Sequence, residues 1–387
     1  MTGSAVARAW RTFLSGGLAT VALAIGLWTA QPAVLAQQAA AAPAAAPSLP
    51  AKLSDADFWK LVTDISEPGG YFRIADNFTS NENEIGRMFT MIRDRKVTGG
   101  VYLGVGPEQN FSYIAATQPD MAFIIDIRRQ AVMQHLMFKA MFELSKDRAD
   151  FISLLFSKAR PAGLDASTPI QAMWQAFFTA PTDPALSAKN HDRIVDHLTK
   201  TRKFVFTPDE TAQLDTVLFA FVQFGPGITT QSGGNGRGGG SAVTFADLTG
   251  WSVDAANQVQ SFLSTEEHFR TVKALHDKNL IVPVSGDFGG EKALRAIGAY
   301  LTERNARVNA FYVSNVEQYL FMEIGKAAAF YANVATMPLN ESSVFLRPYA
   351  LRRYSGPAAL CGITAYLKAA AEGRINSNND SLACGTY

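Results

Sequence analysis

The fold is decided by the stretch GGVYLGVGPEQNFSYIAATQPDMAFIIDIRR, residues 99–129. Within it, two short apolar runs, Val101–Val105 and Met121–Ile127, have the length of buried strands. Between them, Asn110–Thr117 has the apolar spacing of a helix, and glycines interrupt the chain just before it. The order strand, glycine turn, helix, strand predicts a βαβ unit, which places the chain in the α/β class.

Gly104 and Gly106 mark the turn between the first strand and the helix. Glycine is needed where the backbone takes a positive φ or lies against a ligand, and a helix N-terminus offers free N–H groups. Asp126 ends the second strand, 22 residues after Gly104. An acid in a Rossmann-type unit reaches a ribose hydroxyl at about this spacing. The turn and the acid therefore indicate a nucleotide-type site.

Pro107 and Glu108 follow the turn and bear on the choice of ligand. Pro107 removes one N–H, and Glu108 places a carboxylate where the pyrophosphate of a dinucleotide would lie. NAD and FAD therefore fit poorly. A cofactor that lacks phosphate and carries positive charge tolerates Glu108, and S-adenosylmethionine is such a cofactor. Glu108 thus joins the glycines and Asp126 as a candidate cofactor contact.

The run Val101–Asp126 resembles the cofactor-binding half of class I S-adenosylmethionine-dependent methyltransferases. In that family a glycine-rich turn holds the methionine part of the cofactor, and an acid that ends the second strand holds the ribose. Gly104 and Gly106 match the turn, and Asp126 matches the acid. The resemblance implies a Rossmann-like fold, a mostly parallel sheet flanked by helices, with S-adenosylmethionine as the cofactor.

Two positions depart from the usual pattern of those methyltransferases. The chain has Tyr102 where the family usually has an acid, and Glu108 where it usually has a third glycine. A longer part, roughly Tyr71–Tyr349, is similar to an uncharacterised bacterial family, which implies a fold but no activity. That likeness is carried by YFRIADNFTSNE, GGVYLGVGPEQNFSYIA, LIVPVSGDFGGEKALRAIG and FYVSNVEQYLF.

Residues 1–36 have the pattern of a signal peptide. Arg8 and Arg11 form a basic region, Thr12–Ala30 is largely apolar, and Val34–Ala36 provides a small-residue cleavage signal. The alternative is an uncleaved membrane anchor, since the apolar run is close to the length of a bilayer span. In either case we expect the bulk of the chain to be exported, periplasmic or secreted. This location counts against a methyltransferase, because S-adenosylmethionine is made and held in the cytoplasm.

An Ala/Pro-rich linker is predicted over residues 37–50, and residues 51–387 are long enough for one large α/β domain. Further strands are predicted at Leu280–Val284 and Val308–Val313, and Ser343–Leu346 is a candidate last strand. No strong strand pattern separates the second strand from the third. We therefore expect a helical insertion at about residues 146–278.

The composition excludes one class of partner and indicates a crosslink. The formal net charge is +1 and 18% of residues are charged, so nucleic acid is not expected as a partner. The chain has two cysteines, Cys361 and Cys384, which in an exported protein most simply form a disulfide. Two free or buried thiols are the alternative. The spacing of the cysteines does not suit zinc, and no metal site is predicted.

Candidates for substrate contact come from two parts of the chain. Ligands in open α/β sheets bind beyond the carboxyl ends of the strands. Asp287 follows the third strand, and Ser314 and Asn315 follow the fourth, so all three should lie on the rim that carries the glycine turn. Arg73 and Asn77 occupy a polar stretch ahead of that turn and are available to line a cleft.

Three pairs of residues have the spacing of helix N-terminal caps. Thr207 and Glu210 predict a capping box at the start of a helix over Pro208–Phe224. Ser54 and Asp57 predict the start of a helix over Leu53–Thr63. Thr79 and Glu82 have the spacing of a capping box for a helix running to about residue 93, which would explain both without a function.

Two functions remain open on the sequence. The first is a methyltransferase-like protein, in which Asp287 and Asn315 would face the methyl acceptor; methyl transfer needs mainly proximity and orientation. The second is a non-catalytic binding or scaffold protein on the same fold, since fold alone does not establish activity. A hydrolase lacks support, because the sequence has no G-x-S-x-G motif.

Overall fold

A computed structural model describes the chain over residues 48–73, 77–230, 232, 243–352 and 356–384. The predicted signal peptide lies outside the described residues, as does most of the predicted linker. Both remain predictions. The described residues form one compact unit.

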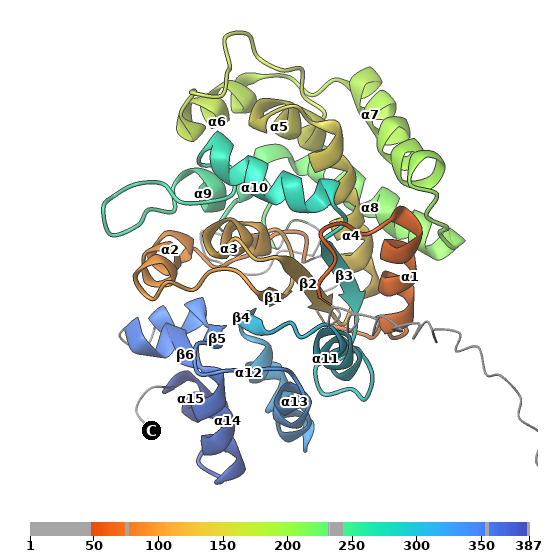
Figure 1. The fold of residues 1–387 in the computed structure, drawn as a ribbon. Coiled ribbons are helices and arrows are strands. Elements are labelled where there is room, and N and C mark those ends of the chain that lie inside the picture. Colours follow the sequence, from red (N-terminus) through yellow and green to blue (C-terminus); the bar gives the residue numbers. More distant parts are fainter. Residues whose placement is uncertain (1–47, 74–76, 231, 233–242, 353–355, 385–387) are drawn as a thin grey trace, which may run out of the picture. The chain divides into compact units, whose positions relative to one another are not determined.

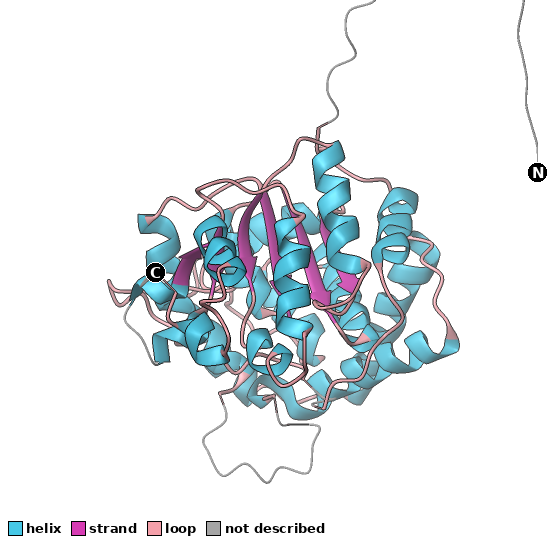
Figure 2. Ribbon diagram, turned by 90° about the horizontal axis from the view of Figure 1, so that it is seen from below, coloured by secondary structure: helices cyan, strands magenta, loops and turns pink. Residues whose placement is uncertain are grey.

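The centre of this unit is a six-stranded sheet (Figures 1 and 2). Its strand order is β3-β2-β1-β4-β5-β6, with β1 to β5 parallel and β6 antiparallel to β5. The order 3-2-1-4-5 is that of the Rossmann fold, with the switch point between β1 and β4. The predicted Rossmann-like α/β fold is therefore confirmed. The strands are β1 (Val101–Val105), β2 (Met121–Asp126), β3 (Ile281–Ser285), β4 (Val308–Tyr312), β5 (Val344–Leu346) and β6 (Leu360–Gly362).

The strands are apolar because helices cover the sheet on both faces. All six residues of β2 are buried, and β2 pairs with β1 in a register that opposes Val101 to Met121. The four strands predicted over residues 101–313 are present within one or two residues of their expected ends, and β5 lies within the candidate last strand. The sequence pattern did not predict β6, because three residues are too few to show a period.

Helices α3, α4 and α10 lie on one side of the sheet, and α11 and α13 lie on the other (Figure 1). The α-helices are α1 (Asp55–Ile65), α2 (Ile85–Asp94), α3 (Gln109–Thr117), α4 (Arg129–Leu144), α5 (Arg148–Phe156), α6 (Ile170–Thr179), α7 (Pro184–Asp196), α8 (Pro208–Phe224), α9 (Phe245–Gly250), α10 (Glu266–Asp277), α11 (Ala293–Glu303), α12 (Val316–Leu320), α13 (Lys326–Ala335), α14 (Ile363–Ala371) and α15 (Asn378–Leu382). Shorter helical turns are η1 (His197–Thr201), η2 (Gly225–Gly227), η3 (Pro348–Arg352) and η4 (Gly356–Ala359). No helix in the described part of the chain is both long and apolar enough to cross a membrane.

The chain between β2 and β3 is helical, as predicted. Helices α5 to α10 occupy the expected insertion, and its described residues form isolated β-bridges but no strand of the sheet. Packing of α4 against α8, α5 and α10 joins this insertion to the sheet.

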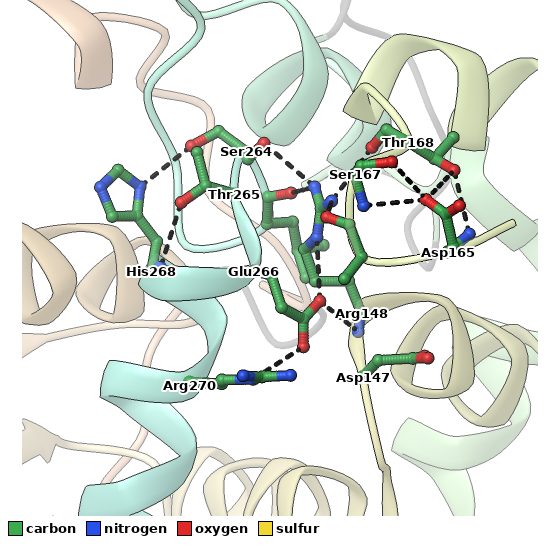
Figure 3. A network of polar contacts seen from close by, with 12 residues as sticks. Asp147, Arg148, Asp165, Ser167, Thr168, Ser264, Thr265, Glu266, His268 and Arg270 are labelled. Carbon is green, nitrogen blue, oxygen red and sulfur yellow. Dashed lines mark hydrogen bonds and ion pairs between the residues drawn. The ribbon is translucent and has the colours of Figure 1, made fainter.

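Arg148 holds three segments of the insertion together (Figure 3). Its side chain is buried, and its Nε donates a hydrogen bond to Oε2 of Glu266 at 3.3 Å. The two terminal nitrogens donate to four backbone carbonyls, so every N–H of the guanidinium has an acceptor. The carbonyl oxygens belong to Leu263, Ser264, Ala166 and Thr168.

The C-terminal part is secured by a disulfide and by a buried ion pair. Cys361 in β6 and Cys384 form the predicted disulfide, with their Cα atoms 5.8 Å apart. Nearby in the chain, Arg347 is fully buried and donates to Glu317 at 2.8 Å and to the carbonyl oxygen of Ser381 at 2.6 Å. These contacts tie the last helix to β5.

Two of the three predicted caps are correct. Thr207 and Glu210 form the predicted capping box of α8, with the Glu210 N–H donating to the Thr207 hydroxyl at 3.2 Å. The Ser54 side chain caps α1 by accepting from the Asp57 N–H at 3.0 Å. The capping box of Thr79 and Glu82 is wrong, because α2 begins only at Ile85 and has no side-chain cap. The side chains of Thr79 and Glu82 instead make contacts with residues far away in the sequence.

Candidate functional site

A pocket of about 280 Å³ lies beyond the carboxyl ends of β1, β2 and β3. Val105 and Ile127, at the ends of β1 and β2, contribute apolar surface. The segment 71–73 and the loop 286–288 after β3 line it, together with residues of α12 and the start of α13. The pocket therefore lies at the carboxyl edge of the sheet, the edge at which open α/β sheets bind ligands.

The segment that carries Arg73 is anchored to the sheet. The N–H of Gly70 donates to the carbonyl oxygen of Ile127 at 2.7 Å. A Cβ at Gly70 would collide with the Ile127 side chain, so glycine is required for this close approach. The carboxylate of Glu67 accepts from the N–H groups of Asp287 at 3.2 Å and Ala293 at 2.8 Å. The segment is thus tied to the ends of both β2 and β3.

Tyr319 of α12 provides an aromatic wall. The Phe72 ring meets it edge-on, with the ring centroids 4.9 Å apart, and the Arg73 guanidinium lies over it at 4.9 Å. Arg73 is exposed and, within the described ranges, its side chain has no hydrogen-bond or ion-pair partner. An unpaired guanidinium at the edge of an apolar pocket is available to a ligand.

Asp287 and Lys326 line the pocket as an ion pair. The ammonium of Lys326 donates to Oδ2 of Asp287, and the N–H of Gly289 donates to Oδ1 at 2.8 Å. The hydrogen bond with Asp287 raises the pKa of Lys326. The pair joins α13 to the loop after β3 and neutralises its own charge.

The predicted glycine turn is formed, but its two glycines have different roles. Gly106 has φ +75°, the left-handed region that favours glycine, and open space around it. Gly104 has no positive φ; a Cβ there would overlap the side chain of Asn110. Asn110 donates to the carbonyl oxygens of Val105, Gly106 and Pro107 at 2.9, 3.1 and 2.7 Å. Gly104 therefore makes room for the chain's own asparagine.

His135 supports the turn from α4. Its Nε2 donates to the carbonyl oxygen of Gly106 at 2.8 Å, and the ring is buried. Burial lowers the pKa of His135 to about 4, so the ring is neutral at pH 7. The histidine acts as a neutral hydrogen-bond donor to the turn.

Asp126 lies where the sequence predicted it, at the end of β2. Its carboxylate accepts from the Arg128 guanidinium through Nη2–Oδ2 at 3.0 Å and Nε–Oδ1 at 3.1 Å, and from the Arg128 N–H at 2.9 Å. Both side chains are more than 90% buried. Asp126 is thus engaged by an internal arginine.

Glu108 is buried at the start of α3. Its Oε1 accepts from the Thr79 hydroxyl at 2.6 Å and from the Ser80 N–H at 3.1 Å, whereas Oε2 has no partner among the described residues. Burial raises the pKa of Glu108 to about 7, against the opposing effect of these hydrogen bonds. Glu108 therefore connects the turn to the segment 79–84.

That segment fills the crevice at the switch point between β1 and β4. Glu82 is buried there and accepts from the Tyr312 hydroxyl at 2.8 Å, the Ser314 hydroxyl at 2.7 Å and Nε2 of Gln109 at 3.3 Å. Burial raises the pKa of Tyr312, and the adjacent Glu82 raises it further. The carboxylate occupies space that a ligand would otherwise enter.

The structure divides the predicted site residues between three places. Arg73 and Asp287 line the pocket. Ser314 bonds to Glu82 in the crevice, and Asn315 is beside it, with its Oδ1 at 3.4 Å from the Ser314 hydroxyl. The remaining predicted residues are outside the pocket lining: Gly104, Gly106, Glu108 and Asp126 at the turn and β2 end, and half-buried Asn77.

The sequence reasoning missed Tyr319, Lys326 and Glu82. Tyr319 and Lys326 lie in stretches with helical patterns, and such a pattern does not predict which loop a helix packs against. Glu82 could have been noticed as an acid in a polar stretch. Its spacing of three residues from Thr79 instead indicated a helix cap. In the described ranges, no group of three or more His, Cys, Asp or Glu side chains could hold a metal ion.

The chain matches a known protein family. Residues 77–176 and 249–369, more than half of the sequence, match the family described as "Domain of unknown function (DUF7790)". The matched segments contain all six strands, the glycine turn and the walls of the pocket on α12 and α13. Arg73 lies just before the first segment. No curated protein matches the chain.

Proposed function

Because the chain belongs to the DUF7790 family, whose description names no activity, we propose from the site alone that the protein binds a small organic molecule. The observation that carries this proposal is the pocket beyond the carboxyl ends of β1, β2 and β3. Ligand pockets typically measure about 300–1,000 Å³. A cavity of about 280 Å³ is near the lower end of that range, which favours a compact ligand.

A non-catalytic binding protein is favoured over a methyltransferase. Ser314, a predicted substrate contact, donates to the chain's own Glu82, which also accepts from Tyr312 and Gln109. Asp126, the residue that the resemblance assigns to the ribose, accepts hydrogen bonds from Arg128 instead. Both arrangements support a protein that has the methyltransferase-like fold but does not transfer methyl groups.

The proposal places the protein outside the cytoplasm, in the periplasm or as a secreted protein. It rests on the basic and apolar pattern of residues 1–36, and the disulfide supports it because such bonds persist in oxidising compartments. The uncleaved anchor remains the alternative for the N-terminal segment.

Titration calorimetry of the purified protein tests the ligand class. S-adenosylmethionine, S-adenosylhomocysteine and adenosine are the first ligands, because the sequence resemblance proposes them. Binding that is lost in Val316→Phe, which narrows the pocket, and retained in Arg270→Gln, on exposed surface of α10, supports a nucleoside ligand in the pocket. Absence of binding by all three at millimolar concentration contradicts the cofactor proposal.

A further inference from the structure

We infer that the ligand of this pocket carries an acidic group, a carboxylate or a phosphate, which binds Arg73, on a flat apolar body. This inference rests on the proposed binding function and specifies its ligand. Three independent features carry it: the charges around the pocket, the geometry of the arginine, and the surface beneath it.

Among the described residues that line the pocket, Arg73 is a cation with no ion-pair partner. Lys326 and Asp287 form an ion pair with each other. Glu323, on the exposed turn before α13, is a second acid near Lys326. Its negative charge raises the pKa of that lysine further. Arg73 lies on a different segment, and no described carboxylate pairs with it. An acidic ligand would give Arg73 the direct counterion that no described side chain provides.

The geometry of Arg73 prepares it for an anion. A guanidinium that lies over a ring uses none of its N–H donors on that ring, so they stay available to the two oxygens of a carboxylate or phosphate. Tyr319 provides the ring, and Phe72 packs edge-on against that ring from the neighbouring position in the chain. Tyr319 is therefore the positioning residue for Arg73.

The surface next to Arg73 selects the body of the ligand. Val105, Ile127 and Leu320 contribute apolar side chains, and Phe288 and Tyr319 contribute aromatic ones. A flat ring buries apolar area against such a surface and keeps its acidic substituent at the edge. The limited volume excludes a dinucleotide and suits one or two fused rings.

Matched ligands test the inference by ligand-observed NMR and calorimetry on the full chain. Indole-3-acetate and phenyl phosphate carry the two acidic groups, and indole-3-acetamide is the neutral counterpart of the first. We expect the amide to bind about tenfold more weakly than the acetate, which corresponds to one charge-assisted contact. The stronger of the two acids identifies the group that Arg73 prefers.

Arg73→Gln is the decisive variant, because the side chain is exposed, and we expect the fold to tolerate its replacement. It should weaken both acids about tenfold and leave the amide unchanged. Arg270→Gln is the matched control and should change none of the three. Equal binding of acid and amide, unchanged in Arg73→Gln, would overturn the inference while the binding function stands. Failure of all three ligands to bind at millimolar concentration would overturn the inference, and failure of the nucleosides as well would overturn the binding function itself.

Discussion

The carboxylate of Asp126 and the guanidinium of Arg128, two residues apart, form a buried two-point contact at the carboxyl end of β2. The Arg128 N–H donates to the same carboxylate, so the pair also fixes the backbone between β2 and α4. A carboxylate with three internal donors has little capacity left for a ribose. Its first role in this fold is therefore structural.

Replacing Asp126 by Asn removes the charge that Arg128 faces. Removing one member of a buried ion pair is strongly destabilising, and we expect a loss of about 3 kcal/mol in the free energy of unfolding, measured by urea denaturation. Asp64→Asn is the control, since the Lys60–Asp64 pair is exposed and its loss should have no measurable effect. An Asp126→Asn protein with full stability and lost ligand binding would show that the acid serves the ligand.

Glu108 should make stability depend on pH near neutrality. Its pKa is raised by burial to about 7 in the folded protein, so the folded state binds a proton that the unfolded state releases. The stabilisation is complete below the unfolded pKa near 4.5 and is lost as pH rises through 7. Across this pH range the contribution of Glu108 to the free energy of unfolding changes by about 3 kcal/mol.

Glu108→Gln isolates this effect, because glutamine resembles the protonated acid and keeps an oxygen for Thr79 and Ser80. We expect urea denaturation to show that the free energy of unfolding of the wild type, measured relative to that of the variant, is lower at pH 8 than at pH 5. The buried His135 has its pKa lowered by burial and opposes the trend, but it acts equally in both proteins. Parallel pH profiles for the two would contradict the assignment.

The two glycines of the turn should respond differently to alanine. Gly106→Ala forces a side chain into a positive φ with space around it, at a cost of about 1 kcal/mol. Gly104→Ala must displace Asn110 from its three carbonyl acceptors, and we expect a larger loss of about 2–3 kcal/mol. Thermal denaturation of each variant measures the difference.

A double-mutant cycle identifies the cause of the larger loss. If Gly104→Ala acts through Asn110, then the cost of Gly104→Ala should be much smaller in an Asn110→Ala background. Additive costs would mean that Gly104 is required for another reason, such as the approach of a ligand.

The parts of the fold that the sequence predicted depend on local patterns. Strands β1 to β4 are apolar runs with turn residues at their ends, and the Ser54 cap depends on a residue three positions away. Their physical causes lie within a few residues, so a single sequence contains them. The switch from strands to a helical insertion after β2 could be inferred in the same way.

The candidate site depends on contacts that no local pattern encodes. Thr79 bonds to Glu108, 29 positions away, and Glu82 bonds to Tyr312, 230 positions away. The spacing of Thr79 and Glu82 is that of a helix cap, but in the structure both side chains bind long-range partners instead. Tyr319 could not be predicted to hold Arg73, because the contact depends on the packing of α12 beside segment 71–73.

Arg148 should be among the most sensitive positions of the insertion. Lysine at this site keeps the charge but cannot reach the five acceptors that the guanidinium fork serves, which would leave buried carbonyls unpaired. We expect Arg148→Lys to cost about 3 kcal/mol or more. Arg270→Lys, on the exposed end of the same network in Figure 3, is the control and should leave stability almost unchanged. Equal melting temperatures for the two variants would contradict this role.

The disulfide gives a prediction that joins stability to location. Protein recovered from an oxidising compartment should gain the mass of two hydrogens on reduction, at Cys361 and Cys384. Free thiols in that sample would count against both the crosslink and the export proposal.

Replacing both cysteines by serine should lower the free energy of unfolding by about 3 kcal/mol, the typical value for a loop of this length. The loss should be confined to the C-terminal segment at first, because the crosslink ties the end of α15 to β6 and takes no part in β1 to β4. Hydrogen exchange should therefore show faster exchange over residues 378–384 and little change in β1 to β4. Unchanged exchange in that segment would mean that buried Arg347, which binds the carbonyl oxygen of Ser381, alone secures it.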